Sequence, residues 1–219
     1  MSRRLTIAVF VSGEGTTLDA LAELVMGEHL PARIALVVAD RPHAFAIERA
    51  RRRGLPTVVL PSRGVDPDDW SRRVTAELES KGVELVVLAG FLTILPTSWV
   101  ERWKGRAINI HPALLPRYGG AGMYGHHVHE AVLAAGDRES GATVHLVTAD
   151  VDRGPTLAQE RVPVLAGDTP DTLRARLHPV EVGLLAAVIR RFAEGALPLP
   201  YPEREAPAAG EREEPDARR

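Results

Sequence analysis

Short apolar runs alternate with helical patterns along the first half of the chain. The runs are almost continuous, which is typical of strands that are buried on both faces of a parallel sheet. Helical periodicity fills intervals between them, at residues 18–26, 44–53 and 67–81. Strands that alternate with helices predict βαβ crossovers and a parallel sheet. The predicted strands cover residues 5–11, 34–39, 57–60, 84–89 and 107–110.

The second half of the chain predicts two more strands and one long helix. The strands cover residues 141–148 and 157–165, and the helical pattern covers residues 168–194. Pro179 lies inside that pattern, so we expect it to kink or split the helix just before Glu181. The predicted fold is α/β, with a three-layer, mostly parallel, doubly wound (Rossmann-like) sheet of about seven strands.

Composition limits the possible classes of protein. The 219 residues are 45% hydrophobic and 26% charged, with a formal net charge of −2, so neither a membrane span nor a general attraction to nucleic acid is expected. The absence of cysteine excludes disulfides and thiolate metal ligands. The first residues lead into a strand pattern without signal-peptide architecture, which favours the cytoplasm. Because the end of the chain is rich in Pro, Glu and Arg, we expect one domain over residues 1–197 and a disordered tail over residues 198–219.

A glycine-rich turn, Ser12-Gly13-Glu14-Gly15-Thr16-Thr17, joins the first strand to the first helix. Glycines let the backbone approach a ligand, and the first N–H groups of a helix are unpaired, so this arrangement is suited to an anion. A tight turn with a helix cap explains the same residues equally well. The turn has neither the Walker A lysine nor the third glycine of a dinucleotide-binding fingerprint.

The strand at residues 107–110 ends in two polar side chains and a proline. Asn109 and His111 are two residues apart, so their side chains point to the same face of an extended strand. Pro112 fixes its own φ and favours an extended backbone at His111. An amide beside a titratable ring is suited to polarising a carbonyl and moving a proton. The alternative is a turn-forming asparagine beside an incidental histidine.

Three loops carry further candidate residues. The apolar loop 90–96 is either core under a loop or a wall for a flat aromatic ligand at the carboxyl edge of the sheet. The loop 119–125 contains four glycines and precedes several histidines, of which we expect His127 to donate a hydrogen bond near a substrate and none to hold zinc. Asp152 lies in a Gly-Pro turn. If its loop meets the end of the strand just described, the carboxylate would orient His111 and raise its pKa.

Two other features have structural explanations. The basic run at residues 49–53 falls in the last turn of a predicted helix, where cations suit the helix dipole and are solvated. Trp99 and Trp103 are four residues apart, so they lie on one helix face and are expected to pack.

Several motifs occur together in a fixed order, and the set is far more specific than any one of them. The chain carrying them resembles the phosphoribosylglycinamide formyltransferases, a family of folate-dependent enzymes of purine synthesis, over about residues 5–197. The motifs are Ser12-Gly13-x-Gly15-Thr16-Thr17-Leu18, Leu88-Ala89-Gly90-Phe91, Asn109-Ile110-His111-Pro112-x-Leu114-Leu115-Pro116, Gly141-x-Thr143-Val144-His145 and Asp152-x-Gly154-Pro155.

The resemblance implies the formyltransferase fold and transfer of the formyl group of 10-formyltetrahydrofolate, a co-substrate, to the amine of 5-phosphoribosylglycinamide, without a metal. It implies that Asn109 is the oxyanion donor, His111 the general acid and base, and Asp152 the group that raises the His111 pKa. Its partners would be small molecules, with no nucleic acid or membrane, and the protein would be a monomer or homodimer. The implied binding residues are Gly15, Thr16 and Thr17 for the ribotide phosphate, Glu181 for the same substrate near its amine, and Leu92, Thr93, Ile94, Leu95 and Asn109 for folate.

Three alternatives share some of these features. Methionyl-tRNA formyltransferases carry a second, basic C-terminal domain, whereas we expect only a tail after residue 197. Formyltetrahydrofolate hydrolases carry an N-terminal regulatory domain, whereas this chain starts at its first strand. In a non-catalytic nucleotide-binding module, Gly13-x-Gly15 would bind phosphate, and Asn109 and His111 would be structural.

Overall fold

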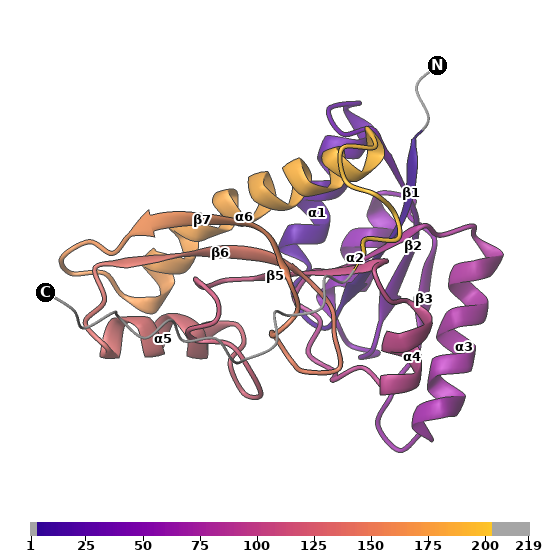
Figure 1. Cartoon of the computed structure of the whole chain (residues 1–219), viewed down its shortest axis with the longest axis horizontal. Coiled ribbons are helices and arrows are strands. Elements are labelled where there is room, and N and C mark those ends of the chain that lie inside the picture. The colour runs from indigo at the N-terminus through magenta and orange to yellow at the C-terminus, as the bar shows by residue number, and fades with distance from the viewer. Residues whose placement is uncertain (1–3, 203–219) are drawn as a thin grey trace, which may run out of the picture.

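The computed structural model describes residues 4–202, which form one seven-stranded sheet flanked by helices (Figure 1). The strand order is β3-β2-β1-β4-β5-β6-β7. The first five strands of that order run parallel, and β6 is antiparallel to both of its neighbours. This arrangement confirms the predicted α/β, doubly wound sheet. The strands are β1 (Leu5–Val11), β2 (Ala32–Ala39), β3 (Thr57–Val59), β4 (Leu85–Leu88), β5 (Ala107–His111), β6 (Glu139–Leu146) and β7 (Thr156–Pro163).

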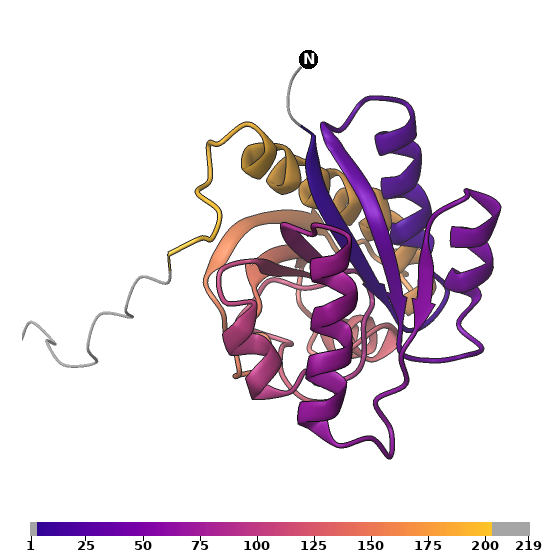
Figure 2. The same cartoon turned by 90° about the vertical axis from the view of Figure 1, so that its right-hand side faces the viewer.

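Helices cover both faces of the sheet and complete three layers (Figures 1 and 2). Alternate residues of β1 enter different cores: Val9 packs with α1, α2 and α6 on one face, and Phe10 packs with α3 and α4 on the other. Because both faces of β1 are covered, its sequence is almost continuously apolar. The helices are α1 (Thr16–Met26), α2 (Phe45–Arg52), α3 (Pro67–Ser80), α4 (Thr97–Arg102), α5 (His126–Ala134) and α6 (Pro170–Ala193).

The sequence predicted a kink or a split at Pro179; the long helix α6 is continuous through this residue, so the split does not occur. Thr169 and Thr172 form a reciprocal capping box at its start, which fixes where the helix begins. Buried side chains, including Leu177 and Leu185, line the helix on both sides of the proline. We attribute the continuity to this packing, which offsets the hydrogen bond that a proline removes. Within residues 4–202, no helix combines the length and apolar character needed to cross a membrane.

The tryptophans at α4, one in the helix and one at its C-cap, pack in the core, as predicted. Trp99 and Trp103 are buried, and their rings stack with centroids 6.0 Å apart. Past the end of α6, Leu199 and Tyr201 also pack against the core, and the Tyr201 N–H donates to the carbonyl of Gly105 at 2.8 Å. Ordered contacts therefore extend beyond the predicted domain end at residue 197. The rest of the predicted tail, residues 203–219, lies outside the described residues.

Candidate active site

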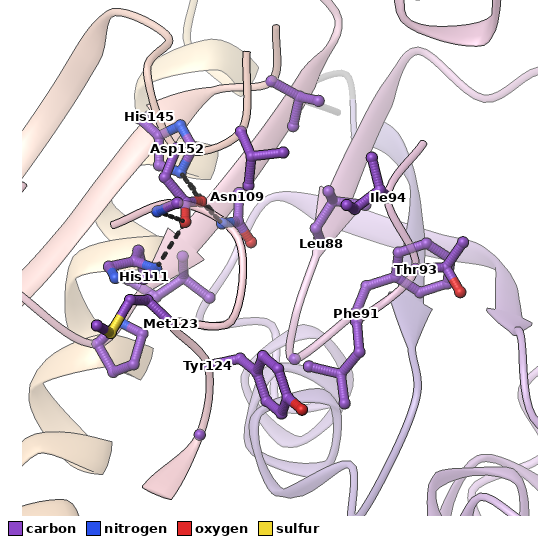
Figure 3. A pocket seen from close by; sticks show the side chains of 18 of the residues that line it. Leu88, Phe91, Thr93, Ile94, Asn109, His111, Met123, Tyr124, His145 and Asp152 are labelled. Atoms are coloured by element: carbon purple, nitrogen blue, oxygen red, sulfur yellow. Dashed lines mark hydrogen bonds and ion pairs between the residues drawn. The ribbon is translucent and has the colours of Figure 1, made fainter. Parts of the chain in front are cut away.

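A cavity of about 410 Å³ lies at the carboxyl edge of the parallel strands (Figure 3). Its wall is built from the ends of β4 and β5, the loop before α5, the faces of α5 and α6 and the loop after β6. Most of the sequence-predicted site residues line it; the exceptions are His127 and Gly15, the N-cap of α1 directly before the lining. Those that line it are Thr16, Thr17, Leu92, Thr93, Ile94, Leu95, Asn109, His111, Asp152 and Glu181.

Asn109 lies in a hydrogen-bonded cluster near the end of β5. Its amide nitrogen donates to Nε2 of His145 at 3.1 Å and to Oδ1 of Asp152 at 3.4 Å. His145 lies opposite Asn109 because β6 pairs antiparallel with β5. Its Nδ1 donates to the Leu146 carbonyl at 2.8 Å, so Nε2 of the neutral ring carries no hydrogen and accepts from Asn109. His145 ends one of the motifs named above but was not among the predicted site residues. The available signal was a histidine within an apolar strand.

His111 is buried at the last position of β5, and each ring nitrogen has one partner. Nε2 donates to the carbonyl oxygen of Tyr118 at 2.7 Å, since a carbonyl can only accept. Nδ1 lies 3.6 Å from Oδ2 of Asp152. In the neutral ring Nδ1 therefore carries no hydrogen, and it is the atom at which the ring takes up a proton.

The electrostatics of His111 differ from the sequence expectation. Burial lowers the pKa of the ring below its usual 6.5, and it outweighs the opposite effects of the Asp152 charge and the Tyr118 carbonyl. The Asp152 charge does raise the pKa of His111, as expected, but its effect is smaller than that of burial. The net pKa is lowered, because desolvation disfavours the imidazolium more than the carboxylate favours it.

Asp152 is held by the backbone around it. Its φ of 56° is unusual for a residue with a side chain, and such conformations persist where the surroundings enforce them. One constraint is Gly154, where an added Cβ would lie 1.9 Å from the Leu146 carbonyl oxygen, so the loop packs directly on β6. The Gly120 N–H donates to Oδ2 at 3.0 Å. Burial raises the pKa of Asp152, but the nearby His145 and His111 imidazoles and the hydrogen bond from the Gly120 N–H lower it overall, so the carboxylate is ionised.

The glycine turn before α1 is supported from behind by α2. Gly15 has φ +70°, and an added Cβ would lie 2.5 Å from the Cβ of Ala46, so only glycine fits. Arg49 donates to the Glu14 carbonyl at 2.8 Å and pairs with Asp19 at 3.2 Å. Two members of the basic run, Arg49 and Arg53, thus join α2 to α1 through Asp19, and the predicted solvated helix end is wrong for them.

The loop after β4 forms the apolar side of the cavity. Phe91 packs edge-on against Phe10, with ring centroids 5.3 Å apart. The Leu92 N–H donates to Oγ of Ser12 at 2.7 Å, and the Thr93 hydroxyl donates to Asp40 at 2.7 Å. These bonds attach the loop to the ends of β1 and β2. Phe91 therefore packs on the core, and residues 92–95 line the cavity.

A third group of polar residues lies on α5 and α6. Arg174, His178 and Glu181 are spaced i, i+4 and i+7, so they share one face of α6 that meets the cavity beside His129. Burial raises the pKa of Glu181 to about 7, against the lowering effect of Arg174. Burial, with the charges of nearby groups including Arg174, lowers the pKa of His129 to about 4. Nδ1 of His129 and Nε2 of His178 are buried without a hydrogen-bond partner.

Two histidines of α5 differ in their place relative to the cavity. His127, which the sequence predicted near a substrate, is exposed, contacts Glu130 at 3.3 Å and is not part of the cavity lining. His129, two residues later, is buried and lines the cavity. Within residues 4–202, no three His, Asp or Glu side chains are grouped so that they could hold a metal ion.

Sequence comparisons connect the chain to enzymes that carry formyl groups. The family model described as Formyl transferase matches residues 5–189. The phosphoribosylglycinamide formyltransferase of Escherichia coli (strain K12) is 36% identical over 196 residues, covering 89% of this chain and 90% of that protein. The trifunctional purine biosynthetic protein adenosine-3 of Drosophila pseudoobscura pseudoobscura is 38% identical over 201 residues, but the chain spans only 14% of its length.

A solved structure extends this likeness to the fold. The crystal structure of glycinamide ribonucleotide transformylase 1 from Symbiobacterium toebii matches with a TM-score of 0.83 at 35% identity. The match covers 91% of this chain and 92% of that one. The similarity of fold therefore extends over most of both chains.

Proposed function

The chain belongs to the formyl transferase family, and from this membership we infer that it is a phosphoribosylglycinamide formyltransferase. It transfers the formyl group of 10-formyltetrahydrofolate to the amine of 5-phosphoribosylglycinamide, a step of purine biosynthesis. One observation carries the assignment of the site. Asn109, His111 and Asp152 meet in one cavity, between the start of α1 and the apolar loop after β4. The partners of the protein are small molecules. The protein acts as a monomer or homodimer in the cytoplasm and does not bind nucleic acid.

The ribotide occupies the side of the cavity near α1 and α6. Its phosphate lies at Gly15, Thr16 and Thr17, where unpaired N–H groups and the helix dipole favour an anion. Thr17 has a hydroxyl in place of the amide common in the family and still offers a hydrogen-bond donor. Glu181 binds the same substrate near its amine. The folate lies against residues 92–95, whose side chains form part of the lining.

Asn109 stabilises the charge that develops on the formyl oxygen. When the substrate amine attacks, a C–N bond forms and the carbonyl oxygen becomes an oxyanion. One amide hydrogen of Asn109 is held firmly by His145, whereas the other makes a 3.4 Å bond to Asp152, which is at the long limit for hydrogen bonds. This second hydrogen is available to the oxyanion. One such donor contributes roughly 3 to 4 kcal/mol in comparable sites.

His111 moves the proton that the reaction must relocate. The attacking amine loses a proton, and Nδ1 of the neutral ring takes it up, directly or through one water. The imidazolium is then stabilised by Asp152 at Nδ1 and by the Tyr118 carbonyl at Nε2. The ring returns the proton to the folate nitrogen as the original C–N bond breaks. The products are the formylated ribotide and tetrahydrofolate, and no oxidant or metal enters the balance.

A turnover assay with the full chain tests this function. The protein is mixed with glycinamide ribonucleotide and 10-formyltetrahydrofolate, and the appearance of deformylated folate is followed. We expect turnover only when the ribotide is present. Folate release without ribotide would identify a hydrolase instead, and binding of both compounds without turnover would identify a non-catalytic module.

A further inference from the structure

Three side chains behind His111 form a hydrogen-bonded group that the proposed mechanism does not use. The hydroxyl of Tyr118 donates to Oδ2 of Asp137 at 2.7 Å. Arg117 pairs with the same carboxylate oxygen at 2.9 Å, and its guanidinium lies over the Tyr118 ring, 5.0 Å from the centroid. We call Arg117, Tyr118 and Asp137 the Tyr118 anchor. None of these three residues is part of the cavity lining described above.

The backbone at Tyr118 has a conformation that its surroundings must enforce. Its φ of 57° lies in the left-handed region, which is uncommon for a residue with a bulky side chain. At the next residue, Gly119, an added Cβ would lie 2.5 Å from Cδ2 of Leu115 and 3.1 Å from the Cβ of Asp152. This turn is therefore packed against the catalytic carboxylate on one side and tied to Asp137 on the other.

Asp137 is itself fixed, because it joins the end of α5 to the start of β6. Its N–H donates to the Val132 carbonyl of α5 at 3.4 Å. The hydrogen bond from Tyr118, together with Arg117, lowers the pKa of Asp137, so the carboxylate is ionised. Burial and the Asp137 carboxylate raise the pKa of the Tyr118 hydroxyl, which therefore keeps its hydrogen. A hydrogen bond to an ionised acceptor is stronger than one between neutral groups, so this contact is suited to holding the turn.

The carbonyl of Tyr118 decides which nitrogen of His111 carries the hydrogen. In the neutral ring only one nitrogen is protonated, and Nε2 is the one that faces this carbonyl, at 2.7 Å. If the carbonyl moved away, the ionised Asp152, which lies 3.6 Å from Nδ1, would draw the hydrogen to Nδ1 (Figure 3). A ring protonated at Nδ1 cannot take up the proton of the amine at that atom.

We propose that Asp137 is a positioning residue for formyl transfer: by holding the Tyr118 side chain, it keeps the Tyr118 carbonyl against Nε2 of His111 and leaves Nδ1 free to accept a proton. The inference rests on the proposed function, in which Nδ1 receives the proton of the attacking amine. Because Asp137 lies outside the cavity lining, its loss should change kcat and not the KM values.

Kinetics of Asp137→Ala test this role. We expect kcat to fall about tenfold, because small displacements of a catalytic group cost up to about 100-fold, and each KM should stay within about twofold of the wild type. Asp137→Asn should restore kcat to within about twofold, since its side-chain oxygen still accepts from the Tyr118 hydroxyl. Glu139→Ala is the matched control, because it removes a carboxylate that pairs with Arg161 at 2.6 Å. A wild-type kcat in Asp137→Ala, or the same loss in Glu139→Ala, would overturn the proposal.

Nitrogen-15 NMR of the His111 ring measures the tautomer itself, which a general loss of stability would not change. Above the pKa of the ring, the wild type should carry its hydrogen on Nε2, and Asp137→Ala should carry part of it on Nδ1. The pKa of the ring should also fall further below 6.5, because the Tyr118 carbonyl raises it. The other titratable groups near the ring are the same in both proteins: Asp152, His145 and His129. An unchanged tautomer in Asp137→Ala would overturn the positioning role even if kcat falls.

The two measurements also separate this inference from the proposed function. If the tautomer changes as expected but the wild type shows no ribotide-dependent turnover, the positioning contact stands and the proposed function fails. If the wild type turns over and Asp137→Ala matches it in kcat and tautomer, only the positioning role fails. Thermal unfolding checks that each variant folds. Should Asp137→Ala be unfolded, Tyr118→Phe, which removes only the hydroxyl, takes its place with the same expected changes in kcat and tautomer, and wild-type values for both would overturn the proposal.

Discussion

Two polar clusters face the same cavity and differ in how their hydrogen bonds are satisfied. In the β5–β6 cluster, defined as Asn109, His111, His145 and Asp152, the side chains bond to one another or to backbone carbonyls. In the α5–α6 cluster, defined as His129, Arg174, His178 and Glu181, two buried ring nitrogens have no partner. Burial also favours the neutral forms of two of its members: it lowers the pKa of His129 and raises that of Glu181.

This difference leads us to expect that the β5–β6 cluster acts in the chemical step and that the α5–α6 cluster contributes to ribotide binding. Groups that are already oriented act on a transition state without further reorganisation, which is where fixed dipoles are most effective. Unsatisfied buried groups are costly in the free protein, and a ligand that supplies the missing partners recovers that cost. Changes in the β5–β6 cluster should therefore reduce kcat. Changes in the α5–α6 cluster should alter ribotide affinity or the pH dependence of stability.

The largest effect should come from His111→Ala. Because the ring carries the migrating proton, we expect kcat to fall about 10³-fold. Ribotide affinity, measured by calorimetry, should change less than about threefold, since the phosphate turn is separate. His43→Ala, at an exposed position on the α2 side of the molecule, serves as the control. A loss of ribotide affinity as large as the loss of rate would contradict the separation of the two clusters.

An intermediate effect should appear in the pH dependence of stability through His129. Its pKa of about 4 in the folded chain lies below the unfolded value of 6.5. The unfolded chain thus binds the proton first, and stability that is present above pH 6.5 is lost as the pH falls toward 4. By pH 4.5 the wild type should lose up to about 2 kcal/mol of unfolding free energy from this group.

His129→Gln should remove that contribution. Urea unfolding between pH 7 and pH 4.5 measures the loss in each protein, and the variant should lose less stability than the wild type over this interval. Equal losses in the two proteins would show that His129 takes up its proton equally well in the folded and unfolded states.

A smaller effect should be seen in ribotide binding by Glu181→Gln. At pH 8, above its pKa of about 7, Glu181 is mostly charged, and losing a charged hydrogen-bond partner should weaken binding about tenfold. At pH 6 the carboxyl is mostly protonated and resembles the amide, so wild type and variant should bind within about twofold of each other. Calorimetric titrations at the two pH values make this test. A tenfold difference that persists at pH 6 would remove the ionisation of Glu181 from the account.

The sequence was most informative where local rules decide the outcome. The apolar runs located the strands, and the two-residue spacing of Asn109 and His111 placed both on one face. The sequence could offer the role of Asp152 only on the condition that its loop meets the end of β5, and the family resemblance then implied it, because no local pattern shows that the loop returns there. His145 needed the antiparallel β5–β6 register, which periodicity does not reveal.

The wrong predictions share a different cause. The predicted split at Pro179 does not occur because the tertiary packing of α6 outweighs the tendency of proline to break a helix. Local propensity alone cannot show this packing. His127 and His129 look equivalent in the sequence. The direction in which the α5 helix faces the sheet decides that one is exposed and the other buried. Arg174 and His178 are four residues apart, a spacing that predicts one shared face of α6, but the sequence prediction did not include them.

The ionisation of the His111 ring tests the central claim most directly. Asp152→Asn removes the charge that raises the ring's pKa but keeps a side chain of the same shape. An NMR titration of the His111 ring should find a pKa below 6.5 in the wild type and a still lower one in the variant. An identical or higher pKa in Asp152→Asn would show that the carboxylate does not stabilise the imidazolium, and the proton path described here would be wrong.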